Sequence, residues 1–147
     1  MENKVIDRVR RLFRFQAELV ELLPESALAE KLNMPSNTIG AQYWCVVGAR
    51  ESYTKAIRED DWAGFGCSLT GTDTTDKQKV LTALVASAAA FDQAIEGLEW
   101  TEARRDLLLD LMEHETQHQG QLIRYVYGLH LKFPQSWLDR WSLEQTK

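Results

Sequence analysis

Four stretches of the chain carry apolar residues at helical spacing, and this pattern constrains the fold more than any other feature. The stretches cover approximately residues 3–23, 36–57, 75–95 and 101–128. Apolar side chains recur in them every three or four positions, which is the period of an amphipathic helix. No segment shows the strict alternation of a half-buried strand. The sequence therefore predicts an all-α protein, a four-helix bundle that forms one domain over residues 1–147.

The connections between these helices have recognisable boundaries. Pro24 ends the first helix, and Ser36 or Asn37 is a suitable N-cap for the second. Thr75 and Gln78 fit a capping box for the third helix, Thr101 can cap the fourth, and Gly128 can end it. The segment 58–74 is rich in glycine, threonine and aspartate, so it predicts a long loop that is a crossover or a functional lid. The tail should pack back on the helices through its tryptophans, Trp137 and Trp141.

Charge and composition exclude several classes of function. The net charge is −5, from 17 basic and 22 acidic residues, whereas a nucleic-acid-binding surface needs a basic footprint. No segment reaches the roughly 20 apolar residues of a membrane span, and the first residues are charged where a signal peptide would be apolar. Two cysteines imply no disulfide framework. We therefore expect a cytoplasmic protein that binds neither nucleic acid nor membranes.

The strongest functional signal is a pair of histidines in the last helix. His114 and His118 are four residues apart, so they lie one turn apart on one helix face, followed on that face by Gln121 and Tyr125. Neutral imidazole is a good ligand for zinc, nickel or copper. Alternatively, both rings are exposed or make only structural hydrogen bonds. Two ligands rarely make a site, and the metal hypothesis therefore requires a third.

The segment from His114 to Tyr125, His-x-x-x-His-Gln-Gly-Gln-Leu-Ile-Arg-Tyr, resembles the last-helix motif of the DinB/YfiT-like superfamily of metalloenzymes. Residues 37–53 resemble the second helix of that superfamily, and residues 133–137 resemble its C-terminal segment. The resemblance implies a four-helix bundle, commonly dimeric, with a divalent metal held by three histidines. It also implies an enzyme acting on a small molecule, because some members are thiol-dependent S-transferases.

The chain departs from this family pattern at one position, where Cys45 stands in place of the second-helix histidine. His130, the remaining histidine, follows the predicted end of the last helix. Three interpretations stay open. Cys45, His114 and His118 form a metal site with an open position, most suited to zinc or nickel. Alternatively, a histidine activates Cys45 as a metal-free reactive thiolate. In the third interpretation Cys45 is an inert core thiol.

Several polar neighbours are candidates for supporting roles. Gln42 and Gln121 each lie one turn from a candidate ligand, so their amides either orient a ligand or lie on the helix surface. Glu113 and Glu115 flank His114 and should face solvent or a neighbouring helix, with a general-base role as the alternative. Cys67 lies in the long loop and either approaches the site or anchors the loop.

These observations lead to two hypotheses of different classes. The first is a metal-dependent enzyme of the DinB/YfiT-like type that acts on a small molecule, for instance a thiol-dependent transferase or a hydrolase. This enzyme would be a homodimer. The second is a non-catalytic bundle that binds a ligand or a partner and whose metal site is impaired. Cys45 decides between them, because it occupies the third ligand position.

Overall fold

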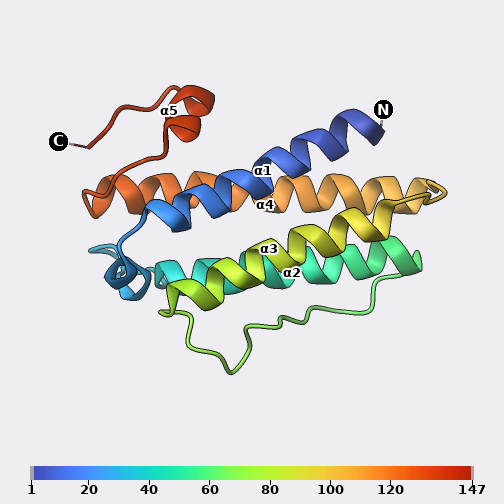
Figure 1. Cartoon of the computed structure of the whole chain (residues 1–147), viewed down its shortest axis with the longest axis horizontal. Helices are drawn as coiled ribbons and strands as arrows, with labels where there is room; N and C mark the ends of the chain where they lie inside the picture. The colour runs from blue at the N-terminus through green and yellow to red at the C-terminus, as the bar shows by residue number, and fades with distance from the viewer. Residues whose placement is uncertain (1, 147) are drawn as a thin grey trace.

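The computed structural model describes residues 2–146, and within them all regular structure is helical. Figure 1 shows the arrangement along the chain. The long helices are α1 (Glu2–Leu22), α2 (Ile39–Glu59), α3 (Lys77–Ile95) and α4 (Glu102–Gly128). A short 3₁₀-helix, η1 (Glu25–Ala29), follows α1, and α5 (Gln135–Trp141) follows α4. The predicted all-α class is confirmed, although the described part of the chain has five α-helices where four were expected.

The four long helices pack side by side in two layers (Figure 1), with α1 and α4 in one layer and α2 and α3 in the other. Each long helix packs against its neighbour in the same layer and against one helix of the other layer, α1 against α3 and α2 against α4, and α2 runs antiparallel to α4. α5 covers one end of α1 and α4 (Figure 1), where the Trp137 indole is fully buried and donates to Phe15 O. The tail therefore packs back as predicted. No helix within residues 2–146 has the length and apolarity that a membrane crossing requires.

The helix starts differ in detail from those predicted. Thr38, rather than Ser36 or Asn37, caps α2 by accepting a hydrogen bond from Ala41 N. Asp76 caps α3 by accepting from Lys79 N, so the predicted capping box is wrong. Thr101 caps α4 as expected. Each cap lies within two residues of its predicted place, because several neighbouring side chains can cap equally well and packing selects among them.

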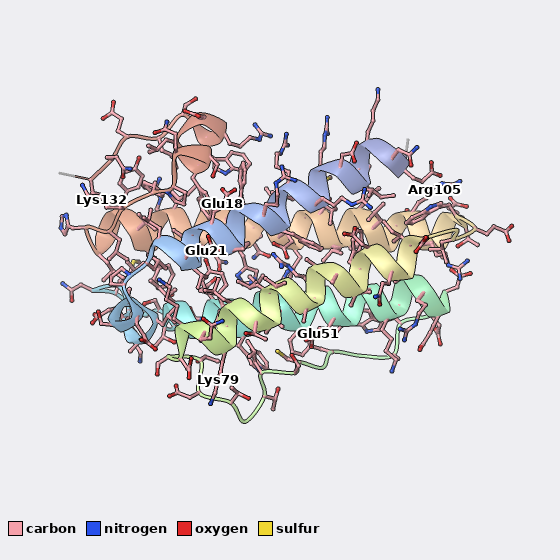
Figure 2. All side chains as sticks on the ribbon, in the orientation of Figure 1. Glu18, Glu21, Glu51, Lys79, Arg105 and Lys132 are labelled. Carbon is pink, nitrogen blue, oxygen red and sulfur yellow. The ribbon has the colours of Figure 1, made fainter. Side chains whose placement is uncertain are left out.

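The segment between α2 and α3 is a crossover fastened to the outer side of α2. It runs along the whole helix (Figure 1), and Glu51 lies on the side of α2 that faces it (Figure 2). The Glu51 carboxylate accepts hydrogen bonds from Ser68 N and Ser68 Oγ. Trp44 stacks on Phe65 with ring centroids 5.0 Å apart, and Cys67 Sγ donates to Trp44 O. Cys67 is thus an anchor of this loop.

Gly48 is the point of closest approach between α2 and this loop, and it generates a stability prediction. A Cβ at Gly48 would lie 2.2 Å from Phe65 Cζ and 2.9 Å from Cys67 Cβ. We expect Gly48→Ala to lower the free energy of unfolding by about 1–3 kcal/mol, because the loop must move. The matched control is Gly120→Ala in α4, where nothing lies within 4 Å of the added methyl. That substitution should raise stability by about 0.5–1 kcal/mol in urea denaturation. If both substitutions stabilised the protein, the close packing of the loop on Gly48 would be contradicted.

One buried ion pair connects all four long helices. Arg50 of α2 and Glu115 of α4 form a two-point ion pair, and both side chains are fully buried. Arg50 also donates to Leu84 O of α3 at 3.3 Å and to Phe13 O of α1 at 3.5 Å. Its guanidinium lies 4.0 Å from the centroid of the Phe13 ring. Arginine suits this place because its planar head donates in several directions at once.

Removal of one partner of this ion pair should be strongly destabilising. We expect Glu115→Ala to lower the free energy of unfolding by about 3–5 kcal/mol, because it leaves a buried guanidinium without its counter-ion. The exposed neighbour Glu113 provides the control, since Glu113→Ala should change stability by no more than about 0.5 kcal/mol. Chemical denaturation of the two variants measures the difference. Equal losses would show that the buried pair does not stabilise the fold.

Candidate metal centre

Cys45, His114 and His118 come together where α2 crosses α4. Cys45 lies on the second turn of α2, and the two histidines lie on successive turns of α4. One ligand atom from each residue lies within 4.8 Å of the others. Cys45 Sγ is 3.6 Å from His114 Nε2, and the two imidazole centroids are 4.5 Å apart. His130 is exposed and follows the end of α4, so it takes no part in the group.

The 3.6 Å separation fits a shared metal ion. Zinc lies about 2.3 Å from a thiolate and about 2.0 Å from an imidazole nitrogen, so a tetrahedral angle between these bonds separates the two ligand atoms by about 3.5 Å. Cys45 Sγ and His114 Nε2 already stand at this distance. The same distance lets a protonated Cys45 thiol donate to His114 Nε2 when no metal is bound. The pair is thus arranged for either state without movement of the helices.

Burial keeps all three groups neutral in the metal-free protein. It lowers the pKa of His118 to about 4, assisted by the nearby His114, and it also lowers the pKa of His114. Neutral imidazoles have a lone pair available for a metal. Burial raises the pKa of the Cys45 thiol, so the metal-free interpretation as a reactive thiolate lacks support. A metal would have to displace the thiol proton on binding.

Polar side chains beside the group divide into those that contact it and those that do not. Gln42 Oε1 lies 2.6 Å from His118 Nδ1, so this amide contacts a candidate ligand and does not simply lie on the helix surface. The Gln121 side chain is half-buried and has no such contact. Glu113 is exposed, whereas Glu115 turns away from the group into the ion pair with Arg50. That ion pair occupies the Glu115 carboxylate, which leaves a general-base role there unsupported.

A shallow, open pocket between residues of α2 and α4 reaches His114. Its volume is about 410 Å³, and it is lined by Tyr53, Asp110, Glu113, His114 and Gln117. His114 is therefore both a candidate ligand and part of the cavity wall. Sequence reasoning missed Tyr53, because it lies two turns beyond Cys45 and carries no motif of its own. A small molecule that enters this cavity would meet the edge of the metal group.

Comparisons with known proteins leave the resemblance as it stood. No family model matches the chain, and no curated protein matches it in sequence. The similarity to the DinB/YfiT-like superfamily thus rests on the residues quoted above. The homodimer and the cytoplasmic location likewise stay predictions.

The neutral His118 makes the metal-free protein sensitive to acid. Unfolded His118 takes up a proton near pH 6.5, whereas the folded residue does so only near pH 4. Its contribution to stability is therefore complete above about pH 6.5 and is lost as the pH falls to about 4. We expect the unfolding free energy of the wild type to fall more steeply over this window than that of His118→Leu. Urea denaturation at several pH values measures both slopes, and equal slopes would contradict a buried neutral His118.

Proposed function

We propose that the protein is a metal-dependent enzyme of the DinB/YfiT-like type that acts on a small molecule. Cys45, His114 and His118 would hold one divalent ion, with zinc preferred over nickel because the ligand set contains a thiolate. The observation that carries the proposal is the convergence of the three ligand atoms, with Cys45 Sγ 3.6 Å from His114 Nε2. The four long helices would then be the four-helix bundle that the resemblance implies.

The ligand set suits catalysis better than a purely structural role. Structural zinc is usually held by four protein ligands, whereas catalytic zinc commonly has three and an open position. In the described residues, three side chains of the metal-binding types converge here. When bound, the metal would act as a Lewis acid or activate a thiol or water nucleophile at neutral pH.

The surrounding residues would bind and orient the substrate. The cavity beside His114 admits a small molecule from solvent, and Tyr53, Asp110, Glu113 and Gln117 supply hydrogen-bonding groups along its wall. The buried side of the group is closed by His118, of which only 6% is exposed. Substrate would thus approach from one side, past His114. A thiol-dependent transfer or a hydrolysis are both compatible with an open metal position reached in this way.

Metal analysis of protein purified without a histidine tag tests the proposal. We expect about one equivalent of zinc or nickel per chain in the wild type, and its loss in Cys45→Ser and in His114→Ala. Two matched controls are available in the same chain. Cys67→Ser alters a cysteine that anchors the loop, and His130→Ala alters an exposed histidine beyond α4. Both controls should retain the metal.

The non-catalytic alternative gives the opposite result. A folded wild type that contains no metal, and that takes up no zinc when zinc is added, would contradict the proposal. Gain of metal binding in Cys45→His would then identify the wild type as a bundle whose site is impaired by the cysteine. Loss of metal in the Cys67→Ser or His130→Ala control would also contradict the assigned ligand set.

A further inference from the structure

The two candidate histidine ligands differ in how their rings are held. His118 Nδ1 lies 2.6 Å from Gln42 Oε1. His114 Nδ1 is buried and has no hydrogen-bond partner in the part of the chain that the structure describes. A neutral imidazole carries its single proton on one nitrogen and its lone pair on the other, so the partner of Nδ1 decides which nitrogen can bind a metal.

A chain of hydrogen bonds determines what Gln42 presents to His118. Gln42 Nε2 donates to Asn37 Oδ1 at 2.8 Å, so the Gln42 oxygen is the end that faces His118. Tyr125 OH donates toward Asn37, 2.6 Å from Oδ1 and 2.5 Å from the backbone oxygen. The chain begins on α4 at Tyr125, passes through Asn37 and Gln42, and returns to α4 at His118. His118, Gln42 and Tyr125 are each 3–6% exposed, so water competes little for these bonds.

The direction of this chain has a chemical consequence. Each amide has a donor end and an acceptor end, so reversal of Asn37 would reverse Gln42 as well. Gln42 would then donate to His118 Nδ1, and the His118 proton would move to Nε2. A protonated Nε2 cannot bind a metal. In the direction observed, Gln42 Oε1 can only accept a hydrogen bond, so Nδ1 carries the proton and donates it to this bond, and Nε2 keeps its lone pair.

We propose that Tyr125, Asn37 and Gln42 are positioning residues that hold the His118 proton on Nδ1 and so keep Nε2 free to bind the metal. The role of these hydrogen bonds in metal binding rests on the proposed function, whereas their geometry does not. His118 would be the ligand that is ready before the metal arrives, because its ring and its tautomer are both fixed. His114 would complete the site with Cys45, since its Nδ1 has no partner to hold the ring.

The tautomer can be measured in the metal-free protein. Nitrogen-15 NMR of the imidazole rings at neutral pH distinguishes a proton on Nδ1 from one on Nε2. We expect wild-type His118 to carry its proton on Nδ1, and Gln42→Leu to lose this fixed preference. Gln42→Glu keeps an acceptor oxygen at this place and should keep the wild-type tautomer. Gln121→Leu is the matched control, because Gln121 lies on the His118 face of α4 and makes no hydrogen bond to the ring.

Zinc affinity supplies a second readout through competition with a chromogenic chelator. We expect Gln42→Leu to weaken zinc binding by about 10–100-fold, as changes in residues that orient a metal ligand generally do. Gln121→Leu should bind zinc as the wild type does. Tyr125→Phe removes the hydroxyl that orients Asn37 and should weaken binding in the same direction as Gln42→Leu, with a smaller change.

The outcomes separate this inference from the proposed function. Wild-type His118 protonated on Nε2, or a Gln42→Leu variant that keeps the proton on Nδ1, would overturn the positioning role. If His118 is protonated on Nδ1 in a protein that binds no zinc, the result would support the role of the hydrogen bonds in fixing the tautomer. It would contradict the metal-dependent function. If Gln42→Leu does not fold, the wild-type tautomer and the zinc affinity of Tyr125→Phe decide the question.

Discussion

The buried ion pair between Arg50 and Glu115 is the interaction on which the rest of the structure depends. Two fully buried charges are stable only when each is neutralised and its hydrogen bonds are satisfied. Arg50 achieves this by contact with α1, α3 and α4 at once. The four long helices therefore keep one mutual register, because a shift of any of them would remove at least one bond of the buried guanidinium.

This register determines where the metal-ligand candidates lie. Glu115 follows His114 directly on α4, and Arg50 lies just over one turn after Cys45 on α2. On the other side of Cys45, Gln42 of α2 bonds His118 of α4. Cys45 thus lies between two residues of α2 that each make a polar contact with the antiparallel α4. A ligand atom needs placement within a few tenths of an ångström of its productive position, and two such contacts restrict the sliding that would spoil it.

Much of the fold followed from the sequence, because apolar periodicity over stretches of about 20 residues is a strong signal. The meeting of Cys45 with the histidines was also foreseen, since the resemblance aligned it with a ligand position. Two features could not be foreseen. Glu115 is adjacent to His114 in sequence, and the sequence does not show that Arg50 would draw it into the core. Asn37 was one of two residues expected to cap α2, but its side chain accepts a hydrogen bond from Gln42 while Thr38 provides the cap.

These misses have a common physical cause. Helical spacing shows which residues share a face of one helix. It does not show which faces of different helices meet, or how far the helices are shifted along their axes relative to one another. Buried polar contacts depend on the relative axial position of the helices, so they can be identified only when the helices are packed.

X-ray absorption spectroscopy at the zinc edge of the zinc-loaded protein tests the central claim most directly. The account predicts one sulfur at about 2.3 Å and two imidazole nitrogens at about 2.0 Å. A coordination shell without sulfur would contradict it.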